Sequence, residues 1–362
     1  MTKQIKVGNI RIGGGAPISI QSMTKTDTRD VRATVRQIKE LEKAGCEIVR
    51  VAIKDFEAAS AIKAIKRKAN LPLVADIHFD YRLALRAIEN GADKIRLNPG
   101  NIYKEPEIRE VVIAAKKRKI PIRVGANSGS IRLKAQGSRL KAEDLVTPVL
   151  GYIKILERMD FYDIIVSLKA SDVISTIEVC KLFSKKSEYP LHLGVTAAGP
   201  ASTGIVKSAI GIGNLLLDGV GDTIRVSLTG DPVEEVIAAK NILQAINLRN
   251  FGPEIISCPT CGRCQVDLKS IAEQIDSRLK ASPGFVRDRQ GSRGKFSLQP
   301  SVFSRKVFKI AIMGCEVNGP GEAKEADIGI ACGKGSGVIF KKGRILKRVK
   351  EKDIVKELLK NI

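Results

Sequence analysis

The sequence predicts an α/β protein: a (β/α)8 TIM-type barrel followed by a small α+β domain. Two observations lead to this prediction. From residue 18 to residue 230, a short apolar run that ends in a polar residue alternates eight times with a helical pattern. Turn residues then interrupt the pattern near Asn250–Pro253, just before a group of cysteines. We therefore assign residues 1–250 to the barrel and residues 251–362 to the second domain.

The eight strand candidates are short, apolar and rich in β-branched residues. They are Ile18–Met23, Ile48–Ile53, Leu73–His78, Lys94–Asn98, Pro121–Ala126, Asp163–Lys169, Leu191–Thr196 and Thr223–Leu228. Between them, segments such as Val31–Ala44 and Ala58–Lys68 repeat their apolar residues at spacings of three and four, which is typical of helices that cover a sheet. Ahead of the first strand, Ile5–Ala16 has turn glycines and predicts a hairpin that closes the bottom of the barrel.

The second domain shows a helix and several strands. The apolar residues Leu268, Ile271, Ile275 and Leu279 have helical spacing. The runs Val307–Met313, Ile328–Ala331 and Gly337–Phe340 predict strands. The basic segment Ser282–Arg305, rich in Gly and Ser, has no periodicity and predicts a loop.

Composition narrows the class of protein. The chain has 362 residues, 43% of them hydrophobic, which suffices for a large core. It shows no signal peptide and no apolar run long enough to cross a membrane, so we expect a cytoplasmic protein without a membrane partner. The net charge of +23 calls for an acidic partner, but a chain with 4% aromatics and no Trp lacks the stacking platforms typical of RNA binders. We therefore expect no nucleic-acid partner.

Charged and polar residues close the predicted strands, where a barrel of this type carries its active site. They are Arg50, Asp76, His78, Arg96, Asn98, Arg123, Asn127, Lys169, Thr196, Arg225 and Ser227. Four arginines and a lysine that converge on one rim repel one another unless an anion lies among them. Because a guanidinium matches two phosphate oxygens at once, the rim predicts a phosphate or diphosphate site.

The two histidines receive different interpretations. His78 lies at a strand end beside Asp76, a position that favours proton transfer. His192 begins its strand and is interpreted as structural.

Cysteines mark a second site. Four of the seven lie within or beside Cys258-Pro-Thr-Cys261 and Gly314–Glu322, and in a reducing compartment such clustering indicates ligands more readily than disulfides. Three thiolates without a clear fourth indicate an iron–sulfur cluster with one open iron. Glu322 is a candidate for an exchangeable fourth ligand. A four-cysteine zinc site that uses Cys264 or Cys332 is the alternative.

The motifs resemble those of the 4-hydroxy-3-methylbut-2-en-1-yl diphosphate synthase family of the methylerythritol phosphate route to isoprenoids, in its two-domain bacterial form. The matching segments are Cys258–Cys261, Gly314-Cys315, Asn318-Gly-Pro-Gly-Glu322, Ala75-Asp-Ile-His78, Ile95–Asn101 and His192–Thr196. The resemblance spans nearly the whole chain.

The resemblance implies a [4Fe-4S] cluster held by Cys258, Cys261, Cys315 and Glu322. It implies reductive opening of 2-C-methyl-D-erythritol 2,4-cyclodiphosphate, with two electrons from ferredoxin or flavodoxin, by a homodimer in which the barrel of one subunit meets the cluster domain of the other. Asp76, His78 and Glu322 are then the catalytic candidates, and the remaining polar residues of the rim bind the diphosphate.

Three departures from the family pattern are visible. Where the family usually has Val-Thr-Glu-Ala-Gly, this chain has Ala197, so a carboxylate implicated in proton transfer is absent. The basic segment Ser282–Arg305 is longer than usual and suggests either a docking element for an acidic electron donor or a plainly disordered segment. Cys264 has no counterpart in the pattern.

Two rival functions follow from the same residues. One is a different iron–sulfur reductase of a phosphorylated metabolite, since a fold does not settle a substrate. The other is a zinc-stabilised RNA-binding protein.

Overall fold

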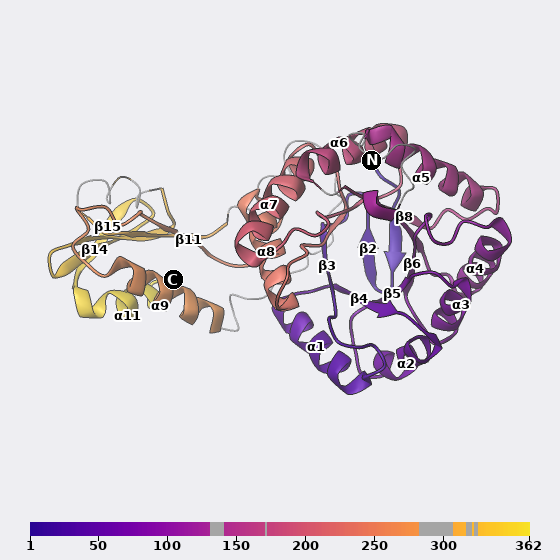
Figure 1. The fold of residues 1–362 in the computed structure, drawn as a ribbon. Helices are drawn as coiled ribbons and strands as arrows, with labels where there is room; N and C mark the ends of the chain where they lie inside the picture. The colour runs from indigo at the N-terminus through magenta and orange to yellow at the C-terminus, as the bar shows by residue number, and fades with distance from the viewer. Residues whose placement is uncertain (131–140, 171, 282–306, 316–320, 322–324) are drawn as a thin grey trace. The chain divides into compact units, whose positions relative to one another are not determined.

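The protein is described here from a computed structural model, which covers residues 1–130, 141–170, 172–281, 307–315, 321 and 325–362. These residues form two compact units, Met1–Arg249 and Asn250–Ile362 (Figure 1). The predicted segment Ser282–Arg305 and the predicted ligand Glu322 lie outside the described residues.

The larger unit contains a parallel sheet of eight described strands that curls into a barrel (Figure 1). Its strands are β3 (Ser19–Met23), β4 (Ile48–Ile53), β5 (Leu73–Ile77), β6 (Lys94–Leu97), β7 (Ile122–Asn127), β8 (Ile164–Lys169), β9 (His192–Leu193) and β10 (Thr223–Ile224). The order is β8-β7-β6-β5-β4-β3-β10-β9, and a parallel bridge between Val166 and Leu191 joins the two ends. The predicted barrel is confirmed.

Helices follow the strands and cover the outside of the barrel (Figure 1). They are α1 (Val31–Ala44), α2 (Phe56–Lys66), α3 (Tyr81–Glu89), α4 (Glu105–Arg118), α5 (Ala142–Glu157), α6 (Val173–Lys186), α7 (Ala201–Leu217) and α8 (Pro232–Ala245). Local chemistry sets their ends. The Asp30 carboxylate accepts a hydrogen bond from the Ala33 N–H at the start of α1, and Gly45 with φ of 103° ends that helix.

The N-terminal hairpin closes one end of the barrel, as predicted. Strands β1 (Ile5–Val7) and β2 (Ile10–Ile12) pair antiparallel. Their buried side chains pack against Ile48, Val74 and Ile165, which belong to the first halves of three barrel strands. The opposite end, where the strands finish, is therefore the end available for a site.

The last two barrel strands are shorter than predicted. The apolar sequences of two segments, Leu191–Thr196 and Thr223–Leu228, predict full strands. Each segment contributes only two residues of regular strand. After Leu193 the chain comes very close to its neighbour, because a Cβ on Gly194 would stand 2.4 Å from the Arg225 carbonyl oxygen. Beyond it Ala197 adopts a positive φ of 50°, so the segment turns instead of continuing the ladder.

The smaller unit is an α+β fold. Its sheet has five described strands, β11 (Glu254–Ser257), β12 (Lys309–Met313), β13 (Ile328–Gly333), β14 (Ser336–Lys341) and β15 (Arg344–Lys350), in chain order. Helices α9 (Leu268–Ala281) and α11 (Ile354–Leu359) pack on it. The predicted helix face is confirmed, since Leu268, Ile271 and Ile275 are buried against Ile310 and Ile330. The sequence analysis missed β11, β15 and α11.

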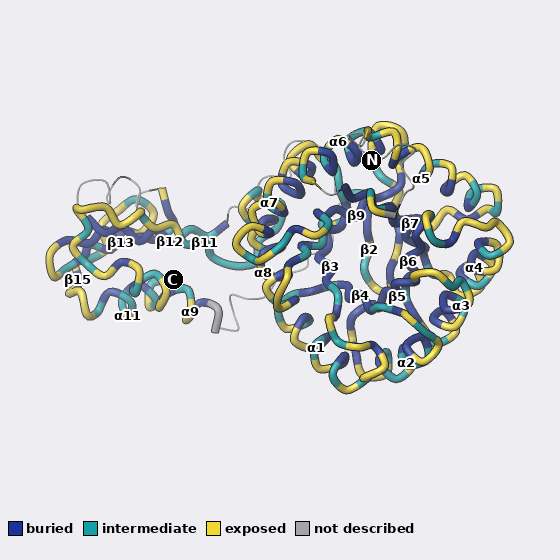
Figure 2. Tube along the Cα trace, in the orientation of Figure 1, coloured by how far each residue is buried: buried dark blue, intermediate teal, exposed yellow. Residues whose placement is uncertain are grey.

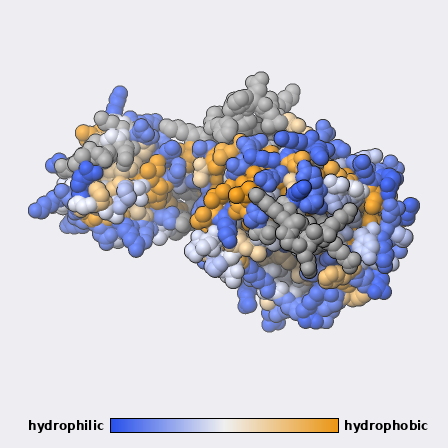
Figure 3. Space-filling model, turned by 45° about the horizontal axis from the view of Figure 1, so that its top comes forward, coloured by the Kyte–Doolittle hydropathy of each residue, from blue (hydrophilic) through white to orange (hydrophobic). Residues whose placement is uncertain are grey.

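Burial follows the barrel pattern. The strands are buried while the outer faces of the helices are exposed (Figure 2). Most of the visible surface is hydrophilic (Figure 3), although α7 exposes Val206, Ile210 and Leu217. None of the described helices combines the length and the apolar character that a bilayer crossing requires.

Asp222 should stabilise the closure of the barrel. Its carboxylate accepts hydrogen bonds from the Thr2 hydroxyl at 2.6 Å and from the Leu191 N–H at 2.8 Å. Asp222→Ala leaves a buried N–H unpaired, so we expect the free energy of unfolding to fall by roughly 1.5–3 kcal/mol in denaturant titrations. Asp218→Ala, which removes only the exposed ion pair with Lys181, should change it by less than about 1 kcal/mol. Equal losses would contradict this role of Asp222.

Candidate functional site

Asp76 lies at the centre of a cationic cluster inside the barrel. Its carboxylate is 3.2 Å from Arg96 Nη1 and 3.7 Å from Arg50 Nε, and it is almost fully buried. Burial raises the pKa of Asp76, but Arg50, a hydrogen bond from His78 and Arg96 together lower it well below its usual range. Asp76 is thus a fixed negative charge that holds two guanidinium groups in place.

Arg123 is a buried cation with no ion-pair partner among the described residues. It lies opposite Arg96 in the register of β6 and β7 and is 1% exposed. Within the described residues, its Nε and Nη1 atoms make no hydrogen bond. Burial, followed by Arg50 and Arg96, lowers the pKa of Arg123 well below its usual value. A buried guanidinium of this kind lowers the stability of the folded state unless an anion binds to it.

Two more cations complete the cluster. Lys169 ends β8 and Arg225 follows β10, and both are largely removed from solvent. Burial and then Arg225 lower the pKa of Lys169 well below its usual range. Burial and then Arg50 lower the pKa of Arg225 to about 10. Five cationic side chains therefore share a space in which Asp76 is the central carboxylate.

Glu235 offsets part of this charge from outside the predicted set. It belongs to the first turn of α8, is 1% exposed, and its Oε2 atom is 3.6 Å from Arg225 Nη2. It also accepts hydrogen bonds from the Leu228 N–H and the Ser22 hydroxyl, and its Oε1 atom is 3.3 Å from Lys25 Nζ. Sequence analysis missed it because an acidic residue in a first helical turn is ordinary.

The remaining predicted residues lie at or beyond the strand ends. His78 follows β5, with 46% of its side chain exposed and Nε2 at 3.7 Å from Asp76 Oδ2. Asn98 is buried after β6, and Asn127 ends β7 in register with Lys169. Thr196 and Ser227 are half-buried in the segments that follow β9 and β10.

Two further basic side chains, Lys94 and His192, are buried at the starts of barrel strands. Lys94 is fully buried at the start of β6, with Nζ at 3.4 Å from Gln21 Oε1, and burial lowers its pKa well below the usual value. Its place could have been found, because Lys94, Arg96 and Asn98 alternate along one strand and so share one face. His192 begins β9 and is fully buried, and its ring nitrogens have no hydrogen-bond partner among the described residues.

The cysteines gather where two parallel strands of the small unit end. Cys258 follows β11, and Gly314-Cys315 follow the adjacent β12. The Gly314 N–H donates a hydrogen bond to Cys258 Sγ at 3.3 Å. Arg263 lies in the electrostatic field of both Cys261 and Cys315. Hydrogen bonds from the Arg263 backbone and side chain lower the pKa of Cys261, which favours the thiolate.

This donor set fits an iron–sulfur cluster. Three soft thiols come from two neighbouring strand ends, and a backbone N–H and a guanidinium are placed to stabilise thiolate charge. In the described part of the chain, no three His, Cys, Asp or Glu residues are arranged around a single metal ion. Cys264 Sγ lies beside Gly314, where a Cβ would stand 2.4 Å from it. Cys332 is fully buried in β13.

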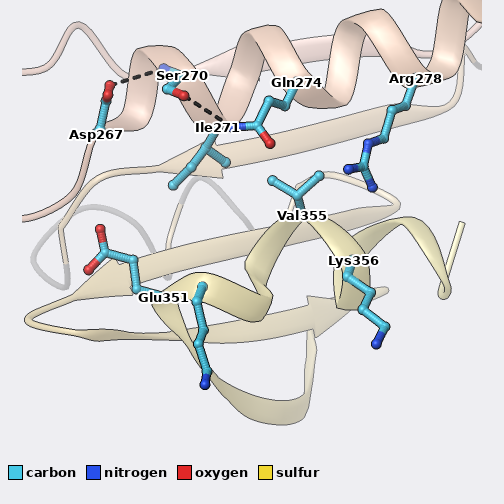
Figure 4. A pocket seen from close by; sticks show the side chains of 9 residues that line it. Asp267, Ser270, Ile271, Gln274, Arg278, Glu351, Val355 and Lys356 are labelled. Carbon is cyan, nitrogen blue, oxygen red and sulfur yellow. Dashed lines mark hydrogen bonds between the residues drawn. The ribbon is translucent and has the colours of Figure 1, made fainter.

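A shallow pocket of the small unit has different chemistry. It lies between α9 and the chain around α11 and is lined by residues such as Asp267, Arg278, Glu351 and Lys356 (Figure 4). The Ser270 N–H donates a hydrogen bond to Asp267, and Gln274 donates one to the Ser270 hydroxyl. Its lining contains neither a cysteine nor a histidine, so the thiols of the small unit and the cations of the barrel remain two separate candidate sites.

Comparisons with known proteins match each of the two units. A family described as GcpE TIM-barrel domain matches residues 2–240, and GcpE protein C-terminal domain matches residues 254–362. A 4-hydroxy-3-methylbut-2-en-1-yl diphosphate synthase (flavodoxin) of Clostridium perfringens is 54% identical over all of this chain and 98% of its own length. Proteins with that name from Caldanaerobacter subterraneus and Thermodesulfovibrio yellowstonii are 54% and 52% identical over all of this chain, and 96% and 98% of their own lengths.

Arg123 should lower the free energy of unfolding of the barrel without ligand and raise it when an anion is bound. Arg123→Met removes an unpartnered buried cation but keeps an apolar stem of similar length. We expect its free energy of unfolding without ligand to equal or exceed that of the wild type. Inorganic diphosphate should raise the melting temperature of the wild type and raise that of the variant much less. Loss of stability on the scale of a core truncation, with an unchanged diphosphate shift, would disprove this.

Proposed function

The chain belongs to the GcpE family of 4-hydroxy-3-methylbut-2-en-1-yl diphosphate synthases, and from this membership we propose that it reductively opens 2-C-methyl-D-erythritol 2,4-cyclodiphosphate. It is an enzyme of this type, as relatives with that name match its full length. In the proposed reaction, two carbon–oxygen bonds break and one carbon–carbon double bond forms. Two electrons and two protons are taken up for each fully protonated substrate molecule, and one water is released.

The observation that carries the proposal is the surplus of buried positive charge in the barrel. Arg50, Arg96, Arg123, Lys169 and Arg225 surround one fixed carboxylate, and Arg123 has guanidinium nitrogens without a partner in the described residues. A diphosphate offers several oxygens and at least two negative charges to such a set. Asn98, Asn127, Thr196 and Ser227 are placed to donate or accept the remaining hydrogen bonds. The cations then bind and orient the substrate, and burial excludes water.

We assign the cluster ligands to Cys258, Cys261 and Cys315, with Glu322 as the fourth. A [4Fe-4S] cluster would supply the two electrons one at a time and an iron with an exchangeable site. The chain contributes the setting: Gly314 donates its N–H to Cys258, and Arg263 offers positive charge to Cys261 and Cys315. The contact with Arg263 favours the thiolate of Cys261 over its thiol.

Proton transfer falls to Asp76 and His78 in this proposal. Asp76 stays a carboxylate because its arginines lower its pKa, so it is a poor proton donor. Its role in the proposal is to orient His78 and to stabilise the protonated form of that ring. His78 is half-exposed and lies 3.7 Å from Asp76 Oδ2, which suits a group that takes protons from solvent and passes them on. Ala197, which stands where the family usually has Glu, cannot share this task.

The partners follow from the same membership. We propose flavodoxin as the electron donor, because the relatives carry it in their names. We also propose a cytoplasmic homodimer. The exposed apolar side chains Val206, Ile210 and Leu217 support a contact between copies. Because α7 has one charged residue, Lys207, two strongly basic chains can meet at this helix with little repulsion between like charges.

Cys315 and Cys332 provide a matched pair for testing the ligand set. After anaerobic reconstitution, Cys315→Ser should lose the brown colour, most of its bound iron and turnover of the cyclic diphosphate with dithionite. Cys332→Ser should keep all three, because its buried side chain is assigned to the core of the sheet. One bound zinc in a colourless protein, or loss of metal in both variants, would favour a four-cysteine zinc site.

His78 should compensate for the carboxylate that Ala197 lacks. We expect His78→Gln to lower kcat about 100-fold, the usual scale for removal of a general acid or base. Adding Ala197→Glu to that variant should recover a large part of the loss, whereas Ala197→Glu in the wild type should change kcat little. Rates that His78→Gln leaves unaltered would rule out this compensation.

A further inference from the structure

We propose that the exposed edge formed by strand β15 and the turn before it in the small unit is the docking surface for the electron donor, an acidic protein of the flavodoxin class. We call this the β15 surface and define it by its exposed residues, which are Lys342, Arg344, Ile345, Leu346, Arg348 and Lys350. The proposal rests on the proposed function, which requires such a donor.

The cations of this surface are free to meet a partner. In the described part of the chain, Lys342, Arg344, Arg348 and Lys350 form no side-chain hydrogen bond and no ion pair, and all four are exposed. Lys347, between them, differs because it is paired with Glu357. Four unpaired positive charges within nine residues attract an acidic surface and speed the encounter with it.

Two large apolar side chains lie among these charges. Ile345 is 71% exposed and Leu346 is 45% exposed. An apolar contact with a charged rim is the usual make-up of a protein interface, in which the apolar residues contribute affinity and the charges contribute orientation and rate.

A purely protective role explains only half of this pattern. Among the described strands, β15 pairs with β14 alone, so it is an edge strand. Lysines on an edge strand discourage unwanted pairing with other sheets. Protection accounts for the charges, but an exposed isoleucine at the same edge works against it. A surface that must bind a specific acidic partner accounts for both.

Strand register places the C-terminal end of this surface at the end of the sheet that carries the cysteines. Cys332 in β13 pairs with Gly337 in β14, and Gly337 pairs with Val349 in β15. Arg348 and Lys350 therefore lie at the same end of the sheet as the strand ends that lead to Cys258 and Cys315. Three strand spacings separate β15 from β12, or about 14 Å. Because all these elements belong to one compact unit, this proximity is independent of the barrel.

The test compares charge reversal at two surfaces of the reconstituted, full-length enzyme. Arg344→Glu with Arg348→Glu changes the β15 surface. The matched control, Arg32→Glu with Arg36→Glu, makes the same change on exposed arginines of α1 that also have no partner among the described residues. A third variant, Ile345→Ser, removes apolar contact without changing charge.

Turnover is measured with reduced flavodoxin over a range of salt concentrations, and with dithionite. We expect the β15 reversal to raise KM for flavodoxin at least 10-fold at low salt and to flatten its salt dependence. Ile345→Ser should raise KM several-fold at every salt concentration. The α1 reversal should stay within about twofold of the wild type, and dithionite turnover should be the same in all of them.

Equal effects of the β15 and α1 reversals would overturn the proposal in favour of general attraction by a basic chain, and so would no effect of either. Failure of the proposed function looks different, since the wild type would then turn over no cyclic diphosphate even with dithionite. In that case, a binding measurement that monitors the flavin fluorescence of flavodoxin decides the docking proposal. The β15 reversal must weaken flavodoxin binding, and the α1 reversal must not.

Discussion

The structure of the barrel depends on one electrostatic constraint, the burial of more positive than negative charge. Asp76 holds Arg50 and Arg96, and Glu235 holds Arg225, but the nearby Arg123 has no such partner among the described residues. Burial and the neighbouring arginines lower the pKa of both Arg123 and Lys169. A protein keeps such an arrangement when an anion completes it, because unpaired buried cations otherwise lower the stability of the fold. In the proposed function, the substrate diphosphate supplies this anion.

The thiol site has a different origin. Two parallel strands, β11 and β12, end side by side, and each continues directly into a cysteine-bearing turn. The close contact of the Gly314 N–H with Cys258 Sγ depends on the absence of a side chain at Gly314, since a Cβ there would collide with Cys264. A glycine before Cys315 is therefore a packing requirement as well as a means of stabilising thiolate charge.

The division of the chain into two units separates these two requirements. The barrel carries buried cationic side chains, while the small unit carries the clustered thiols, of which Cys261 is exposed, and an exposed basic edge. In the proposed function, an electron donor approaches the small unit, which carries the clustered cysteines. Strand β15 has the charge and the exposed apolar contact for that approach, and β13 and β14 connect it laterally to the cysteine-bearing strand ends.

Local patterns were enough to predict the eight-strand repeat, the span of α1 and the position of Arg96 and Asn98 at the end of a strand, because side-chain period and helix caps depend on near neighbours in the chain. They also predict a metal site from the chemical type of the clustered thiols. The roles of Glu235 and Lys94 were not predictable in this way. Glu235 meets Ser22 across 213 residues, and Lys94 meets Gln21 across the barrel interior. Contacts of that range depend on strand register and barrel closure, which arise when the whole sheet packs and which no short window of sequence encodes.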